Sequence, residues 1–295
     1  MSTPAAPDGL LIVDKPAGWT SHDVVARGRR LAGTRKVGHA GTLDPMATGV
    51  LVLGLGRATR LLGHLGLSAK GYDATIRVGQ TTVTDDADGD VVDARDASDV
   101  SDAAISAAIA KLTGEIIQVP SSVSAIKING ERAYTRVRAG ENVDIPPRPV
   151  TVSEFSVEGV RRLESVIDLD VHVECSTGTY VRALARDMGA LLDVGGHLTA
   201  LRRTRVGPYG LDVAHTLDEL EKELAVVAID AAAAASFVTH VVEETQVAAV
   251  RNGRSLKLRL ESTGPVAMTT EAGEFLALYE QHGPLAKAVA VFAPA

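Results

Sequence analysis

The chain has 295 residues, of which 45% are hydrophobic and 23% charged, a composition typical of a globular protein with one large or two smaller domains. A single cysteine, Cys175, excludes an internal disulfide, and no run of eighteen apolar residues is present to span a membrane. Residues 1–8 lack the basic region and apolar run of a signal peptide. We therefore expect a disordered N-terminus and a cytoplasmic protein.

The net charge of −7 argues, on its face, against a nucleic-acid partner. The charge is unevenly distributed, however, because residues 1–70 carry a net +5 and residues 71–110 a net −7. Phosphate binding depends on a local basic patch rather than on the total charge. The sequence thus permits RNA binding without showing it.

The first elements are a short buried strand and an amphipathic helix. Leu10–Val13 reads as the strand, and Thr20 or Ser21 can cap a helix that runs to about Leu31, with Gly33 as its stop. Two interpretations stay open for the cations near the helix end: a solvated face that complements the helix dipole, or a phosphate-facing patch. These cations are Arg27, Arg29, Arg30, Arg35 and Lys36.

The stretch 38–49 contains three glycines and a proline, which argues against a regular helix or a central strand. Apolar segments bracket it, so we predict a loop held by the core. Asp44 precedes Pro45 and is therefore pushed out of the α region, which fixes the direction of its side chain. Scaffolds present reactive groups on rigid loops in this way, although Asp-Pro and Gly-Thr pairs are also ordinary turn chemistry.

The next segment is free of a recognisable nucleotide or calcium motif. Gly54–Gly56 lacks the third glycine of a dinucleotide fingerprint. In a calcium loop built on the acidic run Asp85–Asp90, Thr84 and Arg95 would stand where Asp and Glu are needed, so an acidic turn is predicted. The pattern predicts a helix over 57–65, a strand over 72–78 and a helix over 101–112 capped by Ser101.

Residues 120–149 are rich in cations. They include Lys127, Arg132, Arg136, Arg138 and Arg148. On residue types alone, the pattern favours a surface hairpin with ordinary solvating charge.

The second half begins with a clear strand over 166–175, where apolar and polar residues alternate. Ser176–Gly178 turns this strand into a helix from about Tyr180 to Leu192. Tyr180 and Arg182 therefore lie near a helix start, where free N–H groups suit an anion. A capping box at 216–219 opens a further helix.

The alanine run 231–235 is the predicted domain boundary. Beyond it, a helix is expected over 245–252, stopped by Gly253, and strands over 256–261, 275–279 and 289–292. Short strands in about 60 residues are typical of a small β-barrel, which we place at 236–295.

Several of these segments together resemble the motifs of the TruB-type tRNA pseudouridine synthases, in the order of that family over roughly residues 9–210. The matching segments are Leu11–Gly18, Gly38–Pro45, Lys70–Tyr72, the run Val78–Gly89, Val119–Ser121 with Ser124–Lys127, Cys175–Arg182 and Leu201–Arg203.

The resemblance implies an α+β fold and a defined activity. We expect a catalytic domain at 9–230 around a mixed, largely antiparallel sheet, with 121–149 as an RNA-binding thumb. Residues 236–295 would form a PUA-like domain that touches the acceptor end of tRNA. The activity would be isomerisation of uridine 55 in the T loop of tRNA to pseudouridine. This reaction involves no redox change or phosphoryl transfer, so we expect no cofactor and no metal. We also expect no membrane association and a monomer.

The resemblance also implies the site residues. Asp44 matches the catalytic nucleophile and Arg182 the active-site arginine. Attack by Asp44 on C6 of the base or on C1′ of the sugar stays open. The other matches concern the pocket of the flipped base: Tyr72 packs on the base and helps to remove the C5 proton, Tyr180 and Leu201 form its walls, and His39 fills the space that the base leaves.

Two other classes of function are alternatives. One is a tRNA-binding or tRNA-folding chaperone whose catalysis is secondary or lost, although Asp44, Tyr72 and Arg182 are all present. The other is a nucleotide-binding enzyme built on the glycine-rich segment, which lacks a complete phosphate-binding motif.

Overall fold

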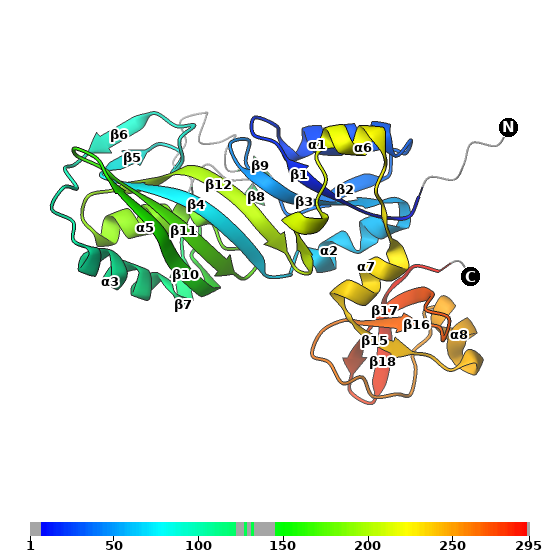
Figure 1. Ribbon diagram of the computed structural model, residues 1–295. Helices are drawn as coiled ribbons and strands as arrows, with labels where there is room; N and C mark the ends of the chain where they lie inside the picture. Colours follow the sequence, from blue (N-terminus) through cyan, green and yellow to red (C-terminus); the bar gives the residue numbers. More distant parts are fainter. Residues whose placement is uncertain (1–6, 122–126, 129–130, 133–144, 294–295) are drawn as a thin grey trace.

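A computed structural model describes residues 7–121, 127–128, 131–132 and 145–293. Within these residues the chain forms a ten-stranded sheet and a separate four-stranded sheet near the C-terminus (Figure 1). The large sheet has the path β14 (Val227–Ala228), β1 (Gly9–Lys15), β3 (Thr48–Leu55), β12 (Gly196–Val206), β4 (Lys70–Val78), β11 (Ile167–Cys175), β10 (Arg148–Arg162) and β7 (Gly114–Gln118), with β2 (Val37–Ala40) paired to β3 and β13 (Tyr209–Gly210) paired to β12.

Among the described residues, the large sheet has one parallel pair, between β12 and β3. Its other described pairs are antiparallel, which confirms the expected mixed, largely antiparallel sheet of an α+β fold. The small sheet has the order β15 (Val238–Val241), β16 (Val266–Thr269), β17 (Phe275–His282) and β18 (Leu285–Val291). Two further pairs are β5 (Gln80–Thr82) with β6 (Val91–Ala94), and β8 (Lys127–Ile128) with β9 (Glu131–Arg132).

Helices pack against both faces of the large sheet and connect it to the small sheet. They are α1 (Ser21–Leu31), η1 (Gly56–Arg60), α2 (Leu62–Leu65), α3 (Asp102–Leu112), α5 (Val181–Leu191), η2 (Leu211–Val213), α6 (Leu217–Lys222), α7 (Ile229–Ser236) and α8 (Glu244–Arg251). Helices α3 and α5 lie behind β4, β11 and β10 in the view of Figure 1, and their apolar residues share one core with these strands. No helix in the described ranges is long and apolar enough to cross a membrane.

Local sequence signals explain the helix starts. The Thr20 hydroxyl accepts from the Asp23 backbone N–H while the Asp23 carboxylate accepts from the Thr20 backbone N–H, a complete capping box. Thr216 and Glu219 repeat this arrangement at α6. Ser101 caps α3 as predicted. These caps satisfy backbone donors that would otherwise lack a partner at each helix start.

Three predicted elements differ in the structure. Gly38–Ala40 belongs to strand β2, because its backbone pairs antiparallel with β3, and a Cβ on Gly38 would lie 3.0 Å from Leu62 of α2. The helix expected over 57–65 is broken into η1 and α2, since Leu61 donates to the carbonyl three residues back, the pattern of a 3₁₀ turn. The strand expected over 256–261 is absent from the described structure. There Leu256 forms one isolated bridge, and Leu260 donates to a Gln281 side chain instead of a strand.

The structure places both the predicted end of the N-terminal segment and the predicted domain boundary within packed parts of the protein. Asp8, expected in a disordered N-terminus, accepts hydrogen bonds from the Arg57 backbone and guanidinium. The alanine run 231–235 lies inside α7, whose buried residues share an apolar cluster with β1 and β17. Most of the expected thumb, 121–149, lies outside the described residues. The domain limits 9–230 and 236–295 stay predictions.

Strands β3 and β12 approach so closely that Gly49 must remain glycine. Its φ is +98°, and a Cβ at this position would lie 2.2 Å from the Arg203 carbonyl oxygen. A side chain here is therefore strained by both backbone conformation and collision. The contact aligns the loop before Gly49 with the central strands.

We expect Gly49→Ala to lower the free energy of unfolding by about 1–3 kcal/mol more than Gly33→Ala does. Gly33 is the matched control because its φ of +61° carries the same type of backbone penalty, while no atom lies within 4 Å of the place that an alanine Cβ would take. Urea unfolding of both variants measures the difference. Equal losses of unfolding free energy in the two variants would show that β3 and β12 can move apart at little cost.

Candidate active site

A recess of about 300 Å³ lies where the loop after β2, the start of α5 and strands β4 and β12 meet. Its lining includes Asp44, Tyr72, Tyr180, Arg182 and Leu201, which are all of the predicted site residues except His39. The chain thus brings together groups that are up to 157 positions apart, from Asp44 to Leu201.

An ion pair dominates the recess. Asp44 Oδ2 lies 3.0 Å from Arg182 Nε, with 36% of the Asp44 side chain exposed and only 5% of the Arg182 side chain. Arg182 projects from the first turn of α5. The amide of buried Gln118 fixes this helix start, because it donates to the Tyr180 carbonyl at 3.1 Å and accepts from the Tyr180 N–H at 2.8 Å.

The pKa of Asp44 is raised above its ordinary value. Loss of solvent is the main cause, the positive charge of Arg182 opposes the rise, and the negative charge of Asp86 adds to it. A desolvated carboxylate held by one guanidinium is a stronger nucleophile than a fully hydrated one, since less water must be displaced when it reacts. The site therefore presents a directed carboxylate in a recess that is only partly open to solvent.

Arg182 has a second set of partners that the sequence analysis missed. Its Nη1 donates to the Thr84 carbonyl at 2.9 Å and lies 3.4 Å from Asp86 Oδ2. Asp86 is itself buried, at 4% exposure. Both residues belong to the acidic turn between β5 and β6. The only sequence signal was a run of aspartates without a cation, which by itself indicates a solvated turn.

The backbone on both sides of Asp44 is fixed. The buried Ser21 hydroxyl donates to the Leu43 carbonyl at 3.0 Å and accepts from the Leu43 N–H at 2.9 Å. On the other side, the Lys15 ammonium donates to the Pro45 carbonyl at 3.2 Å. Burial lowers the pKa of Lys15 to about 8, an effect that the charge of Asp44 opposes. Asp44 is therefore held between two buried side chains.

Tyr72, Tyr180 and Leu201 give part of the recess an apolar and aromatic wall. Tyr72 and Leu201 are 7% and 8% exposed. Burial raises the pKa of Tyr72, while the neighbouring Arg203 guanidinium opposes the rise. The Arg148 guanidinium lies 5.0 Å from the centre of the Tyr180 ring, a cation–π distance. Such a surface can receive a planar, uncharged base.

His39 occupies a different place from the other predicted residues. It lies on β2, where its ring contacts that of His22 edge-to-face, with the centroids 5.7 Å apart. It is not among the described residues that line the recess. Its strand position, next to the loop of Asp44, was not foreseen.

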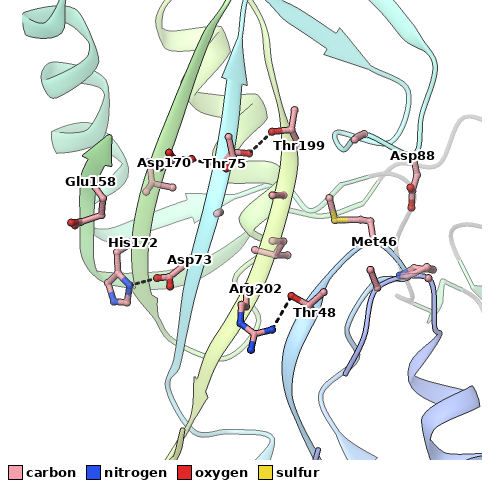
Figure 2. Close-up of a pocket in the computed structure, with 18 residues that line it drawn as sticks. Met46, Thr48, Asp73, Thr75, Asp88, Glu158, Asp170, His172, Thr199 and Arg202 are labelled. Atoms are coloured by element: carbon pink, nitrogen blue, oxygen red, sulfur yellow. Dashed lines mark hydrogen bonds and ion pairs between the residues drawn. The ribbon is translucent and has the colours of Figure 1, made fainter. Parts of the chain in front are cut away.

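A larger groove of about 1190 Å³ lies on the other face of β4 (Figure 2). Successive residues of a strand point to opposite faces, so Asp73 and Thr75 face the groove while Tyr72 faces the recess. Asp73 Oδ1 lies 2.7 Å from His172 Nδ1, and this hydrogen bond raises the pKa of that histidine. Figure 2 marks the contact with a dashed line. Neither Asp44 nor Arg182 is among the described residues that line the groove, so we assign the chemistry to the smaller recess.

Across the described part of the chain, no three His, Cys, Asp or Glu side chains are grouped so that they could hold a metal ion.

Comparison with solved structures supports the α+β fold described above. The structure matches a crystal structure of a Cbf5-Nop10-Gar1 complex with a TM-score of 0.73 and 27% identity, over 98% of this chain and 86% of the other. It also matches an archaeal box H/ACA sRNP Nop10-Cbf5 complex with a TM-score of 0.71 and 25% identity, over 98% and 87% of the two chains.

Family models cover most of the chain. The model "TruB family pseudouridylate synthase (N terminal domain)" matches residues 29–181. The "tRNA pseudouridylate synthase B C-terminal domain" matches 182–244, and "tRNA Pseudouridine synthase II, C terminal" matches 237–293. The chain belongs to the TruB family of pseudouridylate synthases, which confirms the resemblance and the expectation of an enzyme.

Curated relatives agree over nearly the full length. The tRNA pseudouridine synthase B of Streptomyces griseus is 59% identical over 292 residues, covering 97% of this chain and 98% of the relative. The same enzyme of Thermobifida fusca is 56% identical over 290 residues, covering 97% and 99%.

Proposed function

We propose that this enzyme converts uridine 55 in the T loop of tRNA to pseudouridine. The observation that carries the proposal is the pairing of Asp44 with Arg182 in a recess walled by Tyr72, Tyr180 and Leu201. The names of the curated relatives, tRNA pseudouridine synthase B, support tRNA as the substrate.

The reaction breaks the glycosidic C–N bond, rotates the base and forms a C–C bond between sugar and base. It needs a nucleophile beside the sugar–base bond, and Asp44 is the carboxylate that the recess presents. Arg182 orients this carboxylate, and Asp86 with the Thr84 carbonyl holds the guanidinium from behind. Whether Asp44 attacks C6 or C1′ is left open by this arrangement.

The target base must leave the folded T loop before it can reach Asp44. Extrusion costs a few kcal/mol, and stacking on an aromatic ring returns about 1–3 kcal/mol. Tyr72 and Tyr180 supply the rings, and Leu201 the apolar contact. We propose that His39, on the strand that leads to the Asp44 loop, takes the place of the base in the RNA.

Release of tritium from uracil-5-labelled tRNA tests this function. The enzyme should release one tritium per transcript, and replacement of uridine 55 by cytidine should abolish that release. Unchanged release from the cytidine transcript would place the reaction at another nucleotide. Accelerated tRNA folding without tritium release would favour the alternative of a tRNA-folding protein.

We expect tRNA binding to depend on salt despite the net charge of −7. Arg30 and Lys36, both exposed near the end of α1, lie close in sequence to the Asp44 loop. Each phosphate neutralised adds about 0.7–0.9 to the slope of log K against log salt. Changing both residues to Gln should therefore lower the slope by about 1.4–1.8 in filter-binding titrations.

The matched control for this measurement is Lys111→Gln, an exposed cation in the last turn of α3. This variant should keep the wild-type slope. An unchanged slope in the double variant would show that Arg30 and Lys36 contact solvent and not the phosphates of tRNA.

The remaining expectations stay proposals. They are closure of the 121–149 thumb on RNA, contact of residues 236–295 with the acceptor end as a PUA-like domain, a monomeric state and a cytoplasmic location.

A further inference from the structure

Helix α5 starts without the local cap that α1, α3 and α6 have. In those three helices the hydroxyl of the N-cap residue accepts a hydrogen bond from the helix's own backbone. Tyr180 is the N-cap of α5, and its side chain makes no such bond. Serine, threonine, aspartate and asparagine are the preferred N-caps, because their short side chains reach the first free N–H groups. The cap position of α5 is occupied instead by a ring that lines the recess.

A residue 62 positions away takes the place of the missing cap. Gln118, at the end of β7, is 0% exposed, and its amide oxygen accepts from the Tyr180 N–H at 2.8 Å. Its amide nitrogen donates at 3.1 Å to the Tyr180 carbonyl, which also accepts the first intrahelical bond from the Leu184 N–H. A buried amide is costly unless it is hydrogen-bonded. Both ends of this amide bond to a single residue, so the backbone of Tyr180 is fixed relative to β7.

Strand β10 holds the ring of Tyr180 and the turn before it. Arg148 is the direct partner of Gln118 in the antiparallel register, and its guanidinium lies 5.0 Å from the centre of the Tyr180 ring. The Ser176 N–H donates to the Thr151 carbonyl at 2.8 Å, and the Ser176 hydroxyl accepts from the Thr151 N–H at 2.9 Å. The cross-strand pair of Gln118 and Arg148 thus contacts both the backbone and the ring of one recess residue.

Gln118 is not among the described residues that line the recess, so it can act on a bound base only through its neighbours. Tyr180 is the neighbour to which it is bonded. Further along α5, Arg186 Nη2 donates to the Val119 carbonyl at 2.7 Å, which makes a second tie between this helix and the end of β7. Arg182 lies between the two ties.

We propose that Gln118 is a positioning residue that holds Tyr180 in place as a wall on which the flipped base stacks. The inference rests on the proposed function, in which Tyr180 forms part of the base pocket. Fixing the backbone of Tyr180 limits where its ring can lie, and a misplacement of about 1 Å in an active site can cost about 10²-fold in rate.

Single-turnover tritium release with saturating enzyme tests the proposal on Gln118→Met, with tRNA affinity and circular dichroism measured alongside. Methionine has nearly the length of glutamine but no amide, so it keeps the packing and loses both hydrogen bonds. We expect a folded enzyme with wild-type tRNA affinity and a loss of about tenfold or more in rate. A folded variant with the wild-type rate would overturn the inference and leave Gln118 with a role in stability alone.

A double variant separates this inference from the proposed function. Tyr180→Ala removes the ring but keeps the backbone that Gln118 holds, and it should slow the reaction by about 5- to 150-fold, the value of one stacked ring. In this background, Gln118→Met should cost less than about threefold, because the ring that it positions is already gone. A full additional loss would overturn the inference and leave the role of Tyr180 intact. A wild-type rate in Tyr180→Ala alone would instead remove Tyr180 from the proposed base pocket.

Arg162→Met is the matched control. Arg162 of β10 also holds the start of a helix, because its Nη1 donates to the Val100 carbonyl at 2.7 Å, just before the Ser101 cap of α3. No residue of α3 is among the described residues that line the recess. This variant should keep the wild-type rate. A loss like that of Gln118→Met would show a general loosening of the helices on the sheet and would overturn the inference.

Hydrogen exchange of the wild-type enzyme tests the contact without any substitution, in case Gln118→Met fails to fold. The Tyr180 N–H lies ahead of the first intrahelical bond of α5, and it would exchange rapidly if only water accepted from it. We expect this N–H to be protected as strongly as the Leu184 N–H inside the helix. Rapid exchange at Tyr180 together with slow exchange at Leu184 would exclude the contact and with it the inference.

Discussion

Asp44→Asn should bind tRNA with wild-type affinity and release no measurable tritium. The amide has the shape of the carboxylate but lacks the charge that a nucleophile needs. The fold should survive, because Arg182 keeps its contacts with Asp86 and the Thr84 carbonyl and is not left as an unpaired buried charge. We expect a stability change within about 1 kcal/mol in urea unfolding.

The control for this variant is Asp193→Asn. It also removes one carboxylate, from a side chain that is 95% exposed and a backbone with φ of 57° that asparagine tolerates. Its activity should equal that of the wild type. Tritium release by Asp44→Asn at near the wild-type rate would remove Asp44 from the role of nucleophile.

Tyr72→Phe should bind tRNA normally and lose about 10²–10⁴-fold in rate, the usual contribution of a positioned general base. The ring that stacks on the base is kept, and only the hydroxyl is lost. The reason for assigning proton removal to Tyr72 is that Asp44 and Arg182 are already engaged with each other. Single-turnover kinetics with saturating enzyme measure this loss without a contribution from product release.

Tyr72→Leu is the companion variant, because it removes both the oxygen and the ring. It should lose the rate of Tyr72→Phe and, in addition, the roughly 1–3 kcal/mol that aromatic stacking contributes to holding the base. A Tyr72→Phe enzyme within about threefold of the wild type would leave Tyr72 with stacking alone.

Much of the architecture follows from local sequence patterns. The alternation over 166–175 forms β11, and the Ser101 and Thr216 caps start α3 and α6. The glycines and proline around Asp44 lie in a loop held by the core. The residues just before this loop form strand β2, although one of them is a glycine. Such patterns determine structure because hydrogen bonding and side-chain direction within one element depend on near neighbours.

The chemistry of the site was decided by contacts between distant residues. From its own pattern the run Asp85–Asp90 is a solvated turn, yet the fold places Asp86 against Arg182, 96 positions away. Arg203 reads as one basic residue on a strand, yet it is buried against Tyr72 and the carbonyls of Gly41 and Thr42. Charge and polarity in a sequence predict exposure by default. Only the tertiary structure provides the partners that make it favourable to bury these groups.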